Sequence, residues 1–241
     1  MLELKNISFE AETDGVKKQI LRDISLKIDE RFVAVTGPNG GGKSTLARVI
    51  TGVNTPTSGS ILFDGEDITG MSITERAKKG ISFAFQQPVR FKGITVYDLI
   101  SLAAGKKLSV SEACSYLSEV GLCARDYVNR EVNASLSGGE IKRVEIATML
   151  ARSTRLTIFD EPEAGIDIWS FTNLINVFEK MYQKIQGNII IISHQERILD
   201  IADRIIVLAD GRIAADGTKA EVMPTLSKQK PIVCDVLTEK L

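Results

Sequence analysis

A glycine-rich loop between a strand and a helix constrains this chain more than any other feature. The loop fits the pattern G-x-x-x-x-G-K-[ST] and lies between a buried run at 32–35 and a helical pattern at 44–51. Glycines let backbone N–H groups turn toward an anion, and the helix start adds the positive end of its dipole. We therefore expect the loop to hold nucleotide phosphates, with Lys43 on the β- and γ-phosphates and the Ser44 hydroxyl on Mg²⁺. The residues of the loop are Gly37, Pro38, Asn39, Gly40, Gly41, Gly42, Lys43, Ser44 and Thr45.

Short apolar runs predict a parallel sheet around this loop. The runs at 156–159, 189–192 and 205–208 are almost entirely apolar, which is typical of strands buried on both faces. The last run leads into Asp210-Gly211, a dipeptide that favours a hairpin turn. The alternating residues of 2–28, with a polar turn at 13–15, instead predict antiparallel strands. We therefore expect an α/β protein with a mixed sheet core and an N-terminal antiparallel β subdomain.

The sheet pattern is interrupted by a helical block. Residues 95–152 have helical periodicity and contain no buried strand run. We therefore predict an inserted α-helical subdomain at 87–152, within a nucleotide-binding core formed by 1–86 and 153–241. A further helix is predicted at 169–184, whereas the segment after Pro224 has no strong pattern.

Two acidic residues follow the buried run at 156–159. In open α/β sheets, ligands bind beyond the carboxyl ends of the strands. Asp160 would then lie near Ser44 and hold the Mg²⁺, while Glu161 would polarise the attacking water. Adjacent acids at a strand end are often only solvated turn residues, so it is their combination with the loop that favours a catalytic role.

Gln86 and His194 are further candidates at strand ends. Gln86 follows an apolar run at 83–85, with Pro88 ending that strand, and its amide could coordinate Mg²⁺ or position water. The alternative is that Gln86 is a polar loop residue without a catalytic role. His194, the only histidine, follows the run at 189–192 and could donate a hydrogen bond to the γ-phosphate. The alternative is that His194 has only a structural role.

A second glycine pair precedes another helix. Ser137 and Glu140 have the spacing of a capping box, which would explain them without a ligand. Gly138 and Gly139 also allow close approach to the backbone, so their N–H groups could bind a second anion at the helix start. If the helical insertion holds this site far from the loop, a head-to-tail dimer would let each copy close over the other copy's ATP.

Together these motifs resemble the ABC ATPase family over nearly the whole chain. The segment 37–45 resembles Walker A, 156–161 resembles Walker B, and 136–140 resembles the signature motif. Gln86 matches the Q-loop and His194 the switch histidine. The resemblance implies a P-loop NTPase fold that hydrolyses ATP with Mg²⁺. It also implies that the following residues contact nucleotide: Ser137, Gly138, Gly139 and the D-loop residue Asp167.

Finer features resemble the SufC-type ATPases of iron–sulfur cluster assembly. The segment 84–89 resembles that branch's Q-loop, and Glu140 with Lys142-Arg143 resembles its signature, where transporter subunits usually carry Gln. This resemblance implies a SufB- or SufD-type scaffold as partner, in a SufBC or SufBCD system. The alternative is the nucleotide-binding subunit of a membrane ABC transporter, which shares every catalytic motif and would contact a permease around 87–97.

One position departs from the family pattern. Transporter subunits typically carry an aromatic residue near position 11 that stacks on adenine, and this chain has Ala11. Phe9 and Val16 are the remaining candidates, so the adenine contact stays open.

Composition bears on the class of partner. The chain has 30 basic and 31 acidic residues and a net charge of −1. It therefore lacks the excess of positive charge that would favour nucleic acid as its main partner. No apolar run approaches the roughly 18 residues that would span a membrane, so we expect no direct membrane insertion. Cys114, Cys123 and Cys234 are scattered, which predicts neither disulfides nor a metal site. We expect a soluble, cytoplasmic protein.

Overall fold

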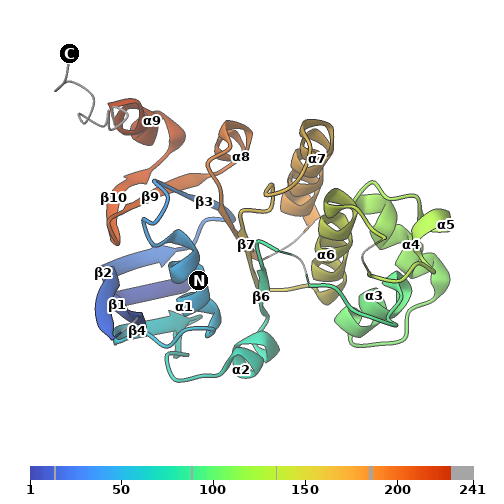
Figure 1. Cartoon of the computed structure of the whole chain (residues 1–241), viewed down its shortest axis with the longest axis horizontal. Helices are drawn as coiled ribbons and strands as arrows, with labels where there is room; N and C mark the ends of the chain where they lie inside the picture. Colours follow the sequence, from blue (N-terminus) through green and yellow to red (C-terminus); the bar gives the residue numbers. More distant parts are fainter. Residues whose placement is uncertain (14, 88, 134, 185–186, 229–241) are drawn as a thin grey trace, which may run out of the picture.

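The computed structural model describes residues 1–13, 15–87, 89–133, 135–184 and 187–228. Figure 1 shows an antiparallel sheet at one end of the molecule, a group of helices at the other, and a second sheet between them. None of the helices in these described ranges has the length and apolar character needed to cross a bilayer. The thiols of Cys114 and Cys123 are free, and Cys234 lies outside the described residues.

The central sheet has six strands in the order β10-β9-β3-β8-β7-β6. Its strands β3, β6, β7, β8 and β9 run parallel, and β10 returns antiparallel beside β9. The predicted strands and the predicted hairpin at Asp210-Gly211 are therefore confirmed. The bounds are β3 Phe32–Thr36, β6 Ile81–Ala84, β7 Leu156–Asp160, β8 Asn188–Ile192, β9 Arg204–Ala209 and β10 Arg212–Gly217. Strand β6 ends at Ala84, before the predicted end at Pro88, which lies outside the described residues.

The N-terminal strands form the predicted antiparallel sheet, in the order β2-β1-β4-β5. The strands are β1 Leu2–Thr13, β2 Val16–Ile28, β4 Ser58–Phe63 and β5 Glu66–Asp67. Helix α1, Lys43–Thr51, packs in one apolar cluster with this sheet and with one face of the central sheet. Helix α2, Ile73–Lys78, follows β5 and leads into β6.

Alternate residues of the central strands face two different cores, which explains why their sequences are almost uniformly apolar. In β8, Ile190 and Ile192 join the cluster around α1, while Ile189 and Ile191 join a second cluster on the other side. All four side chains are at most 2% exposed. The sheet therefore forms a rigid platform whose strand ends carry the candidate site.

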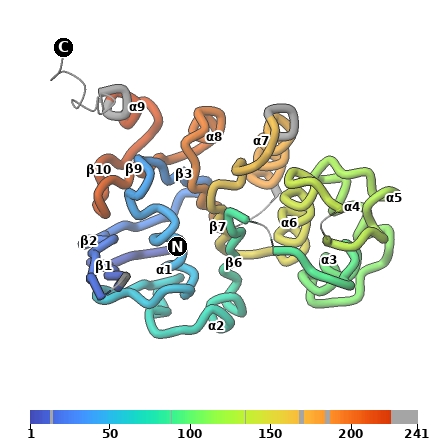
Figure 2. The backbone as a smooth tube through the Cα atoms, viewed as in Figure 1, coloured from blue at the N-terminus to red at the C-terminus, as the bar shows by residue number. Residues whose placement is uncertain are grey.

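The chain leaves the sheet after β6 and returns to it at β7, as the tube in Figure 2 makes easy to follow. In between lie the helices α3 Val96–Ala104, α4 Val110–Glu119, α5 Ala124–Tyr127 and α6 Gly138–Arg152. These helices confirm the predicted helical block. Their apolar residues belong to the same cluster as Phe32, Phe159 and Ile189 of the sheet. The domain boundaries at 87 and 152 remain a prediction.

Three helices follow in the C-terminal half. Helix α7, Ile168–Lys184, confirms the helix predicted at 169–184, and α8, Glu196–Asp200, follows β8. Helix α9, Lys219–Lys228, continues through Pro224, where the sequence shows no pattern.

Candidate active site

The glycine-rich loop connects β3 to α1, as predicted, and packs against the neighbouring strand β9. Gly37 has a φ of 132°, and a Cβ built on it would lie 2.1 Å from the carbonyl oxygen of Leu208. Only glycine fits this backbone conformation and this close approach. Gly41 is similarly tight, since its Cβ would lie 2.6 Å from the same oxygen. The sheet therefore fixes the path of the loop.

The Lys43 side chain folds back into the loop. Its ammonium group donates hydrogen bonds to the carbonyl oxygens of Gly37, at 2.8 Å, and Pro38, at 2.9 Å. The residue is only 5% exposed. A positive charge is thus held within the ring of backbone groups, where it can meet an anion.

Ser44 and Asp160 meet where α1 begins and β7 ends. The Ser44 hydroxyl donates a hydrogen bond of 2.8 Å to Asp160 Oδ1. Asp160 is 2% exposed, and burial raises the pKa of its carboxyl, while the hydrogen bond from Ser44 lowers it. Hydroxyl and carboxylate oxygens are the ligands that Mg²⁺ prefers, so this pair fits a magnesium ion bound together with a substrate phosphate.

Gln86 and Glu161 also meet. The Gln86 side-chain N–H donates a hydrogen bond of 2.7 Å to Glu161 Oε2. Glu161 has a φ of 45°, a conformation that is uncommon for residues other than glycine and that concentrates at functional sites. Its backbone N–H is bonded to Ile192 O at 3.0 Å, which fixes the turn after β7. The arrangement can orient a water molecule and accept its proton.

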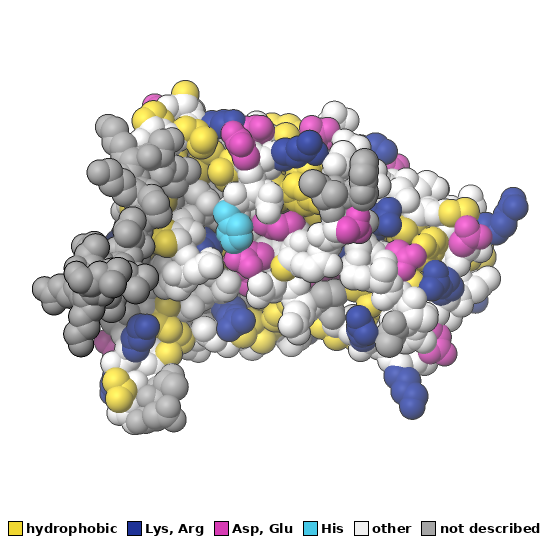
Figure 3. Space-filling model, turned by 45° about the horizontal axis from the view of Figure 1, so that its top comes forward, with side chains coloured by type: hydrophobic (Ala, Val, Ile, Leu, Met, Phe, Trp, Pro, Cys, Tyr) yellow, Lys and Arg dark blue, Asp and Glu magenta, His cyan; other side chains and the backbone are white. Residues whose placement is uncertain are grey.

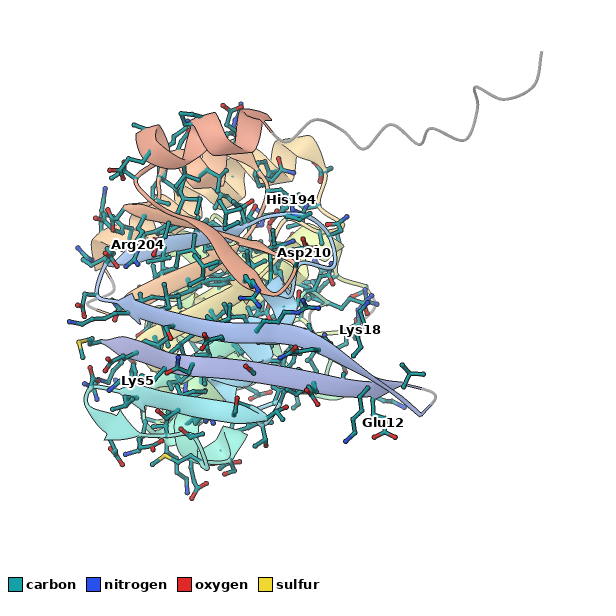
Figure 4. The ribbon with its side chains drawn as sticks, turned by 90° about the vertical axis from the view of Figure 1, so that its left-hand side faces the viewer. Lys5, Glu12, Lys18, His194, Arg204 and Asp210 are labelled. Carbon is teal, nitrogen blue, oxygen red and sulfur yellow. The ribbon has the colours of Figure 1, made fainter. Side chains whose placement is uncertain are left out.

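A cavity of about 660 Å³ joins the loop to these side chains. Besides loop residues, Gln86 and Glu161, it is lined by Lys18, Gln19, Ile20, Arg22, Asp210 and Gly211. Figure 4 shows Lys18 on β2 and Asp210 at the turn between β9 and β10. That turn is bonded to β2 through Arg22 N and Gly211 O, at 2.8 Å, and to the loop through Gly211 N and Gly41 O, at 3.2 Å.

Sequence reasoning missed this wall of the cavity. In the sequence, Asp210-Gly211 is only a turn signal, and Lys18 and Arg22 belong to no motif. The two candidates for adenine stacking do not line the cavity. Phe9 packs against the core and Val16 is 67% exposed, and the residue that stacks on adenine stays a prediction.

His194 lies on the surface, directly after the buried Ser193 at the end of β8. Figure 3 shows His194, the single histidine of the sequence, in cyan beside acidic side chains in magenta. His194 is not among the residues that line the cavity. Asp167 is exposed just before α7.

The segment before α6 has the predicted capping box. Glu140 N donates to the Ser137 hydroxyl at 3.3 Å, and Ser137 N donates to the Glu140 carboxylate at 2.7 Å. A hydrogen bond from Tyr127 lowers the pKa of Glu140, so the carboxylate is anionic near neutral pH. A Cβ on Gly138 would lie 3.1 Å from Gly165 O, which places this segment against the loop before Asp167. Ser137, Gly138 and Gly139 do not line the cavity at the glycine-rich loop.

Comparison with known proteins agrees with this geometry. Residues 21–164 match the family model described as ABC transporter. An uncharacterised ABC transporter ATP-binding protein of Methanocaldococcus jannaschii is 38% identical over 215 residues, covering 85% of each chain. A sulfate/thiosulfate import ATP-binding protein CysA of Bacillus cereus is 33% identical, covering 94% of this chain and 66% of the relative.

A solved structure is similar along most of the chain. It is the dimeric, post-hydrolysis state of the ATP-binding cassette MJ0796, bound to ADP and inorganic phosphate. The TM-score is 0.80 at 26% identity, over 90% of this chain and 98% of the other. The family match covers more than half of the chain, and the fold matches an ATP-hydrolysing cassette. The chain therefore belongs to the ABC transporter family of ATP-binding cassettes and is a Mg²⁺-dependent ATPase.

Proposed function

We propose that this chain is the ATP-hydrolysing subunit of a larger complex and converts hydrolysis into movement of a docked partner protein. The observation that carries this proposal is the hydrogen bond between Gln86 and Glu161. Gln86 directly follows Phe85, which lines an apolar groove on the adjoining surface. Glu161, the candidate catalytic residue, is therefore bonded to Gln86, and the neighbour of Gln86 in the chain lines a candidate docking surface.

The proposed roles in hydrolysis follow from the geometry. Glu161 orients a water molecule and takes its proton as the water oxygen attacks the γ-phosphorus. The bond to the oxygen that bridges the β- and γ-phosphates breaks, and ADP and inorganic phosphate result. The loop amides and Lys43 hold the phosphates. Ser44, Gln86 and Asp160 would hold Mg²⁺, which supplies positive charge to the phosphate oxygens when bound.

We further propose an ATP-dependent head-to-tail homodimer. In it, Ser137, Gly138, Gly139 and Asp167 of one copy would complete the nucleotide site of the other, with His194 contacting the γ-phosphate. Support comes from the helix start at Gly138, which favours an anion, and from its separation from the cavity at the glycine-rich loop. The cassette MJ0796, which is similar in fold, is described as dimeric.

The groove supports the docking part of the proposal. It has a volume of about 410 Å³ and lies between β6, the segment 89–91 and the helices α3 and α6. Phe85, Val89 and Leu102 line it and are 40%, 51% and 68% exposed. Exposed apolar side chains gathered in one groove are typical of protein-binding surfaces.

Two kinds of partner are supported by different observations. The relatives are described as ATP-binding proteins of ABC transporters, which favours a membrane permease. The resemblance of 84–89, and of Glu140 with Lys142 and Arg143, to SufC-type ATPases favours a SufB- or SufD-type scaffold instead. The names of the relatives give the permease the stronger support.

Two experiments test the proposal. Glu161→Gln should retain ATP binding, lose turnover by a factor of roughly 100 or more and accumulate a dimer with ATP, measured by size-exclusion chromatography. Unchanged turnover would refute the role of Glu161. Purification of the native complex then identifies the partner. A multi-span membrane protein supports the permease, a soluble scaffold supports the SufC-type function, and recovery of the chain alone contradicts the docking proposal.

A further inference from the structure

A third carboxylate lies beside the active site and has no part in the roles assigned above. Glu163 follows Glu161 by two residues, in the turn between β7 and α7. Its Oε1 accepts a hydrogen bond of 2.5 Å from the hydroxyl of Ser193. Ser193 is completely buried and directly precedes His194. Glu163 therefore connects the turn that carries Glu161 to the turn that carries His194.

The Ser193 hydroxyl also fixes the backbone around His194. Its oxygen accepts a hydrogen bond of 3.0 Å from Gln195 N, on the other side of the histidine. On the strand side, Ser193 N is bonded to Val35 O at 3.1 Å. A single hydroxyl thus spans His194, and Glu163 determines which way that hydroxyl points, because a carboxylate can only accept its proton.

The second carboxylate oxygen of Glu163 has unused hydrogen-bonding capacity. Oε2 is buried, and no described residue donates a hydrogen bond to it. A buried acceptor without a donor is unfavourable, so such groups usually have a partner in some state of the protein. Burial raises the pKa of Glu163, while the hydrogen bond from Ser193 acts in the opposite direction. Through Ser193, this carboxylate lies next to the turn that carries His194.

We propose that Glu163 is a positioning residue for His194. Through Ser193 it holds the turn, and through Oε2 it accepts a hydrogen bond from one imidazole N–H, which leaves the other ring nitrogen for the terminal phosphate. The imidazole can present one nitrogen to the phosphate in a fixed orientation only if a hydrogen bond holds its other nitrogen. This inference rests on the proposed role of His194 and adds Glu163 and Ser193 to it.

A double-mutant cycle tests the inference. Glu163→Gln keeps the size of the side chain but removes the carboxylate, and Ser193→Ala removes the hydroxyl. Each should lower kcat by roughly 10-fold through misplacement of His194, while the Kd for ATP changes by less than about twofold. In a His194→Ala background, neither substitution should lower kcat further. Glu196→Gln, at an exposed acid on the other side of the histidine, is the matched control and should leave kcat unchanged.

The outcomes distinguish the proposed role of His194 from the proposed positioning role of Glu163. If either substitution lowers kcat by the same factor with and without His194, Glu163 does not act through the histidine and the inference is overturned. Weakened ATP binding that accounts for the whole loss would overturn it as well. Wild-type turnover in His194→Ala would overturn both the role of His194 and this inference. Ser193→Ala keeps the test decisive if Glu163→Gln fails to fold.

Discussion

The Ser44 hydroxyl and the Asp160 carboxylate form a hydrogen bond across 116 positions of the chain. This contact joins the helix that begins at the phosphate loop to the strand that ends directly before Glu161. It places two hard oxygen ligands at the point where the loop and the strand ends converge. With the roles proposed above, the same pair of elements would set the positions of Mg²⁺ and of the attacking water.

Asp160→Asn should both remove ATPase activity and stabilise the fold. Turnover should fall by roughly 100-fold or more, because an amide binds Mg²⁺ less strongly than a carboxylate. Burial raises the pKa of Asp160 above its usual 3.8, so folding favours the protonated carboxyl. The free energy of unfolding therefore falls as pH rises from 3.8 through the folded-state pKa. With a chelator at pH 7.5, the variant should have a Tm higher by roughly 2–4 °C.

Calorimetry at two pH values checks this sign. The gain in Tm should be largest near neutral pH and should disappear as the pH falls below 3.8, where the carboxyl is protonated in both the folded and the unfolded state. A gain that does not depend on pH would contradict the account, and so would a variant that is less stable at pH 7.5.

Gly37→Ala should prevent ATP binding. The added Cβ would lie 2.1 Å from Leu208 O at a φ of 132°, so the loop must move away from β9. We expect the Kd for ATP to rise by roughly 100-fold and the Tm to fall, both measured on the purified chain. Gly70→Ala is the matched control, because nothing lies within 4 Å of its Cβ, and it should bind ATP normally. Normal affinity in Gly37→Ala would contradict the fixed path of the loop.

The strands and most helices could be predicted because their signals are local. The run at Ile189–Ile192 is apolar on both faces, and Asp210-Gly211 is a turn signal over two residues. The glycine-rich loop could be predicted because backbone geometry and charge are written in consecutive residues. The positions of Asp160 and Glu161 near the loop followed from a general rule for strand ends.

The remaining features depend on contacts between distant segments. Lys18 and Arg22 line the cavity because β2 packs beside the turn at Gly211, and nothing in their own sequence encodes that contact. The bond between Glu163 and Ser193 requires that β7 and β8 are neighbours in the sheet. Such pairings are set by topology, so the sequence alone could not reveal them.

Arg76 should be among the most important residues for stability. It is 1% exposed, and its guanidinium donates hydrogen bonds of 2.7 Å each to Val49 O and Ile50 O at the end of α1. It also donates to Met71 O and Thr69 O. Arg76→Met removes all of these donors, leaves Val49 O with only the 3.3 Å bond from Gly52 N, and should lower the free energy of unfolding by about 3–5 kcal/mol.

Denaturant unfolding measures this effect. Arg76→Lys keeps the charge but has fewer donors in a different geometry, so it should recover only part of the loss. Arg125→Met, at an exposed position in α5, is the control and should stay within about 0.5 kcal/mol of the wild type. A loss below about 1 kcal/mol for Arg76→Met would mean that water replaces the missing donors.

Leu102→Glu should separate the chain from the partner proposed above. Leu102 is 68% exposed and lines the groove beside Phe85, so a carboxylate there would have to be desolvated in any apolar interface. We expect recovery of the partner in purification from the native host to fall by roughly 10-fold or more, with the Tm of the chain within a few degrees of the wild type. Val110→Glu is the matched control, because Val110 is 60% exposed in α4 but does not line the groove. Equal recovery of the partner with both variants would place the docking surface elsewhere on the chain.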